Sequence, residues 1–216
     1  MDLLNILPDN LIFVIPSLLL ALTVHEFAHA WVSYRLGDPT PKYQGRLTLN
    51  PLAHIDPLGL VMLMLFRFGW GKPVEIDPRH YRNRRQGVLL VSLAGPGANI
   101  ITAFVLMVGY AVWSLTAPGF VPEFVPQLLG MALMYNILIA LFNMLPVPPL
   151  DGSKVLASIL PPKYSYQFQS FAQQWGLFIL LALIATGLTG RILTPLSNLL
   201  LTGMARLVYT LVGLVL

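Results

Sequence analysis

Apolar residues run in long stretches along this chain, and polar residues gather in the segments between them. Several stretches are long enough for a helix that crosses a bilayer, which takes about 20 residues. The pattern predicts an all-α polytopic membrane protein with three spans and two further helical stretches within 153–216. We treat 1–216 as a single membrane-embedded domain. The apolar stretches cover about Leu11–Arg35, Gly87–Thr116, Gln127–Leu145, Gln174–Leu188 and Leu193–Leu216.

The composition agrees with this class. Hydrophobic residues make up 56% of the chain and charged residues only 10%, whereas soluble domains carry roughly 25% charged residues. No ten-residue alternating pattern suggests a β-barrel. The chain has no cysteine, which excludes disulfides and thiolate catalysis. The net charge of +4 does not indicate nucleic acid. The N-terminus lacks the basic region of a cleavable signal peptide, so we expect the first span to be retained.

The segment 36–86, between the first and second spans, has a different character. GRLTLN (45–50) alternates polar and apolar residues like a strand, and the apolar run LVMLMLF is too short to cross as a helix. Non-helical backbone at membrane depth is tolerated only where protein or a wet cavity surrounds it. We therefore predict a cytoplasmic, re-entrant insertion that is part hairpin and part short helix.

Basic residues are concentrated on one side of this predicted topology. If 58–68 does not cross, eleven of the thirteen basic residues lie at or between the first and second spans or after the third. The positive-inside rule then places the N-terminus outside and these residues in the cytoplasm, in a plasma (inner) membrane. A crossing at 58–68 is the alternative, and it would separate Lys42 and Arg46 from the basic cluster at 79–85.

Two histidines and a glutamate interrupt the first apolar stretch, in VHEFAHAW (24–31). His25 and His29 are four residues apart, so a helix places both on one face, about one turn apart. This H-E-x-x-H spacing suits two imidazoles on one Zn²⁺, with Glu26 as general base toward a water. The alternative is a pair of core histidines beside a snorkelling glutamate. Glu26 lies too deep to snorkel easily, and ionisable groups inside a membrane are functional candidates.

A third ligand is needed, because a catalytic zinc usually has three protein ligands and an open position. Asp151 is the best candidate, since the other acidic residues lie in predicted loops or at ends. The depths agree: His29 is six residues before Arg35, or roughly 9 Å, and Asp151 is three residues before Lys154. Zn²⁺, two neutral imidazoles, one aspartate and ionised Glu26 sum to zero charge, which lowers the cost of burying them.

These motifs resemble the site-2 protease family of intramembrane zinc metalloproteases. The resemblance rests on HEFAH (25–29), AGPGAN (94–99) and NMLPVPPLDG (143–152), in the family's order. It implies a three-helix catalytic core that hydrolyses peptide bonds within or near transmembrane segments of membrane-anchored proteins. The chain resembles compact members, without a PDZ or CBS domain. The implied partners are membrane-spanning substrates and the lipid bilayer, and a homo-oligomer remains open.

The resemblance also implies roles for individual residues. His25, His29 and Asp151 would bind one Zn²⁺ per chain, and Glu26 would act as catalytic acid and base. Asn143 would hold the substrate backbone or the developing oxyanion.

Three further residues belong to AGPGAN, one of the segments that carry the resemblance. Gly95 and Gly97 would let helices approach closely, and Asn99 could hydrogen-bond to the zinc-bearing helix or help to bind substrate. Simple packing is the alternative for all three. The segment 45–59 looks like the membrane-inserted loop of the compact members, which makes His54 a further candidate near the metal. A loop histidine satisfied by backbone is the interpretation of His54 that we favour.

A metal-binding membrane transporter is the main rival, since ionisable residues in spans also mark ion pathways. Such a pathway would need further polar residues along a span, and the last two stretches offer almost none. A di-iron carboxylate enzyme would need a second Glu-x-x-His motif, and the chain has only EFAH. A catalytically silent scaffold is disfavoured because the ligands and the base are all present.

Overall fold

The computed structural model describes residues 11–66, 69–116, 122 and 124–215. Most of the turn expected at 117–126 lies outside the described residues, as do residues 1–10. The described part of the chain is helical and contains no strand, which confirms the all-α class. Among these residues, five helices are long and apolar enough to cross a membrane, so the protein is a multi-pass membrane protein. They are α1 (Leu11–Arg35), α4 (Arg84–Thr116), α5 (Phe124–Asn143), α7 (Pro162–Ala185) and α8 (Leu188–Val215).

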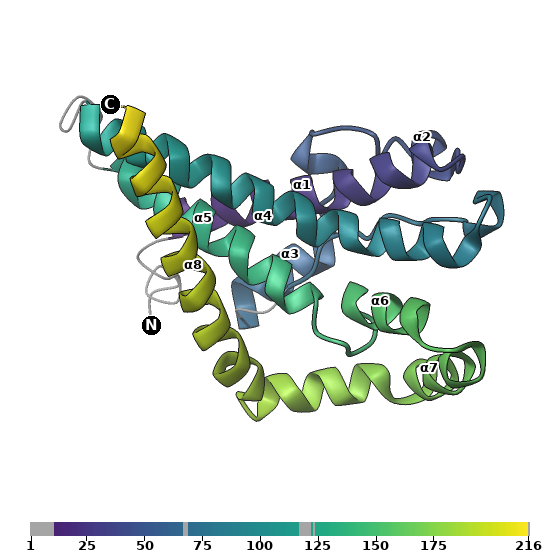
Figure 1. Cartoon of the computed structure of the whole chain (residues 1–216). Helices are drawn as coiled ribbons and strands as arrows, with labels where there is room; N and C mark the ends of the chain where they lie inside the picture. Colours follow the sequence, from purple (N-terminus) through teal and green to yellow (C-terminus); the bar gives the residue numbers. More distant parts are fainter. Residues whose placement is uncertain (1–10, 67–68, 117–121, 123, 216) are drawn as a thin grey trace.

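Helices α1, α4 and α5 form the core of the molecule and pack most extensively on one another. They run roughly along a common direction (Figure 1). The end of α1 and the beginnings of α4 and α7 lie at one end of the molecule, whereas the C-terminal end of α8 lies beside the far end of α4. The three predicted spans therefore become neighbours.

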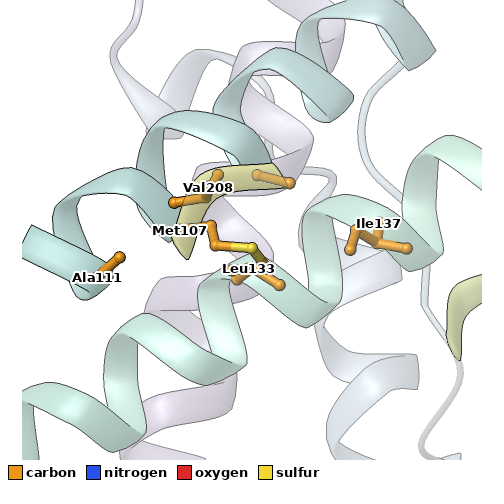
Figure 2. Packing of buried hydrophobic residues seen from close by; sticks show 6 residues of the cluster. Met107, Ala111, Leu133, Ile137 and Val208 are labelled. Carbon is orange, nitrogen blue, oxygen red and sulfur yellow. The ribbon is translucent and has the colours of Figure 1, made fainter. Parts of the chain in front are cut away.

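Helix α8 closes the far end of this core. Val208 of α8 packs with Met107 of α4 and with Leu133 and Ile137 of α5, and all four side chains are buried (Figure 2). Alanines 103 and 111 of α4 are fully buried in the same cluster. Small residues at such positions let helices approach closely, which is how helices associate in membranes.

The chain changes direction sharply between α5 and the short helix α6 (Asp151–Ile159). The sequence places Asp151 near the end of the third span, and the structure makes it the first residue of a new helix instead. Prolines 146, 148 and 149 lie in the intervening turn, where a regular helix cannot continue. A Cβ at Gly152 would lie 2.3 Å from the carbonyl oxygen of Met144, so this return of the chain requires glycine.

The insertion between α1 and α4 consists of short elements. They are α2 (Thr40–Tyr43), a 3₁₀ turn at Pro51–Ala53, α3 (Pro57–Phe66) and a 3₁₀ turn at Pro78–His80. Helix α3 has ten residues, about 15 Å of helix, and a bilayer core is about 30 Å thick. It cannot cross as a helix, which favours the re-entrant interpretation over a crossing at 58–68.

The strand predicted at 45–50 does not form, so that part of the prediction is wrong. Antiparallel pairing occurs elsewhere in the insertion, where Ile55 bridges Gly71 and the Lys72 amide donates to the His54 carbonyl at 2.9 Å. The reason lies in Arg46, which is 3% exposed instead of pointing to solvent as the alternation implies. Its guanidinium donates to the carbonyls of Ala53 and Pro73, and it thus joins the two pairing segments.

Asp38 anchors the insertion to the end of α1. Its carboxylate is fully buried and accepts hydrogen bonds from Ser33 Oγ at 2.8 Å, the Thr40 amide at 2.9 Å and the Asp77 amide at 2.8 Å. Burial alone would raise the pKa of Asp38, but these hydrogen bonds stabilise the ionised form and hold the pKa below its ordinary value. Asp38 therefore ties together three segments at one end of the core.

Replacing Asp38 with Asn should lower the free energy of unfolding by about 1–3 kcal/mol, because buried donors lose a charged acceptor. The stabilisation from a lowered carboxylate pKa is present above about pH 4 and disappears as the pH falls through the folded-state value. Thermal unfolding in detergent across this pH range measures both effects. Glu75→Gln is the control, since Glu75 is exposed and accepts one bond from Gln44. An equal loss in both variants would contradict the anchoring role.

Candidate metal centre

The two histidines of α1 and the aspartate of α6 meet inside the bundle. His25, His29 and Asp151 are all buried. The Nε2 atoms of the two imidazoles lie 3.0 Å apart, and Oδ2 of Asp151 lies 3.2 Å from His25 Nε2 and 2.9 Å from His29 Nε2. Among the described residues, this is the one group of three histidine or acidic side chains that could hold a metal ion.

The other ring nitrogens show which form each imidazole takes. His25 Nδ1 lies 2.7 Å from Asn99 Oδ1, and His29 Nδ1 lies 2.7 Å from the Val91 carbonyl. Both partners are acceptors, so each Nδ1 carries the proton and each Nε2 directs a lone pair toward the other and toward the carboxylate of Asp151. Two lone pairs and an anion at this spacing would repel one another, so a cation must lie between them, either a metal ion or a proton on one Nε2. The residues therefore fit a divalent metal.

A chain of amides fixes the orientation of Asn99. Its Nδ2 donates to the Ala21 carbonyl and to Asn136 Oδ1, both at 2.8 Å, so Oδ1 must be the atom that faces His25. Asn136 in turn donates from Nδ2 to the Ala132 carbonyl at 2.8 Å. Both asparagines are fully buried. The relay from α5 through α4 thus sets the tautomer of a histidine on α1.

Gly95 lets α4 approach the two imidazoles. A Cβ at this position would lie 2.4 Å from His29 Nε2 and 2.7 Å from His25 Nε2. Any side chain there would displace the rings from Asp151. No described atom lies within 4 Å of a Cβ built at Gly97, so the close-packing role expected for Gly97 is wrong.

The second carboxylate oxygen of Asp151 has a partner of its own. Lys154 Nζ lies 3.0 Å from Oδ1, one turn along α6. The carboxylate therefore presents Oδ2 to the histidines while Oδ1 is held by an ammonium group. This arrangement favours a single ligating oxygen.

Glu26 lies between the histidines in sequence and is held by the insertion. Its Oε2 accepts a hydrogen bond of 3.0 Å from the Val74 amide. The preceding residue, Pro73, accepts a bond of 3.0 Å from buried Arg46. Arg46 therefore fixes the extended segment that restrains one oxygen of Glu26.

A cavity of about 500 Å³ lies in front of these groups. It is lined by His25, Glu26, His29 and Asp151, by apolar side chains of α1, and by residues of the insertion. Asn143 also lines it, and its Nδ2 donates to the Ile139 carbonyl at 3.0 Å. The size and mixed lining of this cavity are typical of a ligand-binding site.

The remaining two predicted residues lie elsewhere. Asn99 is fully buried behind His25 and is not among the residues that line the cavity. His54 is also buried, and its Nε2 bonds to the Thr48 carbonyl at 2.8 Å within the insertion. The structure does not bring His54 to the histidine–aspartate group.

Comparison with known proteins places these features in a family. The model of peptidase family M50 matches residues 121–183. YwhC of Bacillus subtilis, named as a candidate zinc metalloprotease, is 36% identical over 192 residues, which make up 86% of this chain and 86% of that protein. The chain belongs to peptidase family M50, the site-2 protease family.

Other relatives of this M50 protein carry similar names. Rip2 of Mycolicibacterium smegmatis, also named as a candidate zinc metalloprotease, is 35% identical over 182 residues, or 81% of this chain and 67% of that one. Zinc metalloprotease MJ0392 of Methanocaldococcus jannaschii is 25% identical over 165 residues, or 76% of this chain and 39% of that one. No solved structure matches the chain significantly.

Three residues around the centre of the M50 protein escaped sequence reasoning. Asn136 is an amide inside an apolar span, a signal that could have marked it. In the sequence, Arg46 stands out only as a basic loop residue within the predicted strand 45–50. Ser92 lines the cavity, and its buried Oγ has no hydrogen-bond partner among the described residues. A serine is common in apolar helices, so the sequence does not mark Ser92 in the way that a buried amide marks Asn136.

Gly95→Ala should weaken metal binding by roughly tenfold or more, the scale seen when the groups that orient metal ligands are disturbed. The added methyl group collides with both imidazoles. Competition with a chromogenic chelator measures the affinity, and Gly97→Ala, two residues away on the same helix, is the matched control. Equal affinities of the two variants would contradict the described packing.

Asn136→Leu should weaken metal binding roughly 10- to 100-fold, because Asn99 loses the acceptor that fixes its orientation. The same competition assay applies. Asn198→Leu makes an identical change at an exposed position of α8 and should leave affinity unchanged. Wild-type affinity in the Asn136 variant would rule out the relay.

Proposed function

We propose that this M50 protein is an intramembrane zinc metalloprotease that hydrolyses peptide bonds within or near transmembrane segments of membrane-anchored proteins. The proposal assigns His25, His29 and Asp151 to one Zn²⁺ and Glu26 to acid–base catalysis. Zinc follows from the donor set of two imidazoles and a carboxylate, which is typical of catalytic zinc, and from the names of the relatives.

One observation carries the proposal. Two Nε2 lone pairs from α1 and a carboxylate oxygen from α6 converge within 3.2 Å, next to a glutamate that lines the same cavity. Three ligands and an adjacent base are the components that a hydrolytic zinc centre requires. A purely structural site would have no use for the cavity or for Glu26.

When bound, zinc would supply Lewis acidity, which activates water and polarises a carbonyl group. Glu26 takes the proton of the attacking water and returns it to the leaving amine, as a general base and then a general acid. The Val74 amide restrains Oε2, so the other carboxylate oxygen is the one directed to this task. Lys154 orients Asp151 by contacting Oδ1 at 3.0 Å, which leaves Oδ2 for the metal.

The lining of the cavity determines which conformation and which side chains of a substrate it would accept. A helical segment has its carbonyl groups hydrogen-bonded within the helix, so the substrate must unwind before a peptide bond can reach Glu26. Its apolar side chains would lie against Leu18, Leu19 and Leu22 of α1. Asn143, which also lines the cavity, would hold the backbone or the developing oxyanion, as an amide donor does in such sites.

The orientation in the membrane follows from the charges. The insertion and the beginning of α4 carry most basic residues, which would place them in the cytoplasm of a plasma (inner) membrane and the far ends of α4 and α5 outside. The metal centre lies toward the basic end, since Asp151 begins the helix that bonds to Arg85. Water would therefore reach it from the cytoplasmic side.

A metal transporter is less well supported. Helices α7 and α8 contain no acidic residue or histidine. Among the described residues, no second group of histidine and acidic side chains could hold a metal ion. The cavity with its adjacent base favours hydrolysis.

Glu26→Gln should retain one zinc per chain and lower the cleavage rate about 100-fold or more, because general acid–base catalysis is lost. Purified protein in liposomes would be tested on a panel of single-span membrane proteins with labelled ends, with zinc measured on the same samples. Glu75→Gln, outside the cavity, is the control and should cleave normally. Normal cleavage by Glu26→Gln would exclude the assigned base.

A further inference from the structure

We propose that a second cavity binds the headgroup of an anionic phospholipid. The cavity lies between the beginning of α4, helix α6 and the first half of α7, and its volume is about 860 Å³. It is separate from the candidate metal centre, although Lys154 and Pro149 line both cavities. The proposal goes beyond proteolysis and does not depend on it.

All charged residues that line this cavity are basic. Arg84, Arg85 and Lys154 line it, and none of its lining residues is acidic. Arg85 is engaged with the last carbonyls of α6, those of Ser158, Ile159 and Leu160. The Arg84 side chain is exposed and has no ion-pair partner among the described residues. An anion in the cavity would therefore meet an arginine that no carboxylate neutralises.

Helix α7 indicates that this anion belongs to a lipid. This helix exposes Tyr164, Tyr166, Phe171 and Trp175, and tyrosine and tryptophan are enriched where membrane meets water. The cavity therefore lies at headgroup depth, in a position where basic pockets between membrane helices bind anionic lipids. Helix α7 itself is long and apolar enough to cross a membrane.

The lining along α7 mixes polar side chains with Phe168 and Ala172 and ends on an apolar residue, against which an acyl chain would lie. Tyr166, Gln169 and Gln173 lie among the polar lining residues, and Leu177 follows one turn later. Leu177 is 57% exposed and Leu181, beyond it, is 46% exposed. A phosphate at Arg84 would thus leave the acyl chains to lie along the leucines of α7.

Binding would be measured on the purified full chain, with phosphatidylglycerol and phosphatidylcholine compared by native mass spectrometry of lipid adducts. The wild type should bind phosphatidylglycerol preferentially. Arg84→Gln should weaken that binding about fivefold, the scale expected for one basic residue near a membrane surface. Arg82→Gln is the matched control, because Arg82 is also exposed but does not line the cavity.

A second pair of variants tests the cavity by adding charge. Gln173→Glu places a carboxylate in the lining and should also weaken binding of phosphatidylglycerol. Gln174→Glu makes the same change on the adjacent, exposed residue of α7, outside the cavity, and should leave binding unchanged. Both changes preserve side-chain shape, so misfolding is not a concern.

Three outcomes would overturn the proposal. One is equal binding of the two lipids by the wild type. Another is an equal effect of each variant and its control, which would show that net charge alone matters. The third is displacement of phosphatidylglycerol by millimolar inorganic phosphate, which would identify a site for free phosphate instead.

Discussion

The convergence of two imidazole lone pairs and one carboxylate oxygen inside an apolar bundle is the constraint on which the rest of this structure depends. Such groups repel one another and lose hydration, so they stay together only where a cation compensates them and neighbours hold them in place. The surrounding residues meet these needs: acceptors on each Nδ1 fix the tautomers, Gly95 gives the rings room, and Lys154 holds the far oxygen of Asp151.

Much of the architecture follows from that constraint. Helix α5 must stop at Asn143 so that the proline-containing turn can bring Asp151 back to α1. The insertion folds over the same region, where Arg46 fixes the segment whose Val74 amide bonds to Glu26. Asp38 ties that insertion to the end of α1. Residues that are far apart in the sequence, such as Asp38, Arg46 and Asp151, thus help to position the side chains of the candidate metal centre.

The sequence predicts the helices and the histidine pair well because both depend on local information. Long apolar runs decide the spans, and a four-residue spacing places His25 and His29 on one face. The partners of Asn136 depend instead on how α4 and α5 pack, which no local pattern encodes. The strand expected at 45–50 fails for a similar reason: alternation implies an exposed Arg46, whereas its guanidinium bonds two distant carbonyls in the interior.

Metal analysis of the purified protein tests the central claim most directly. Zinc content would be determined for the wild type, His25→Ala and Asp151→Ala, since these two ligands come from helices separated by more than a hundred residues. The account predicts one zinc ion per chain in the wild type and its loss in both variants. Zinc retained in full by Asp151→Ala would contradict it, because the carboxylate would then not share the ion with the imidazoles.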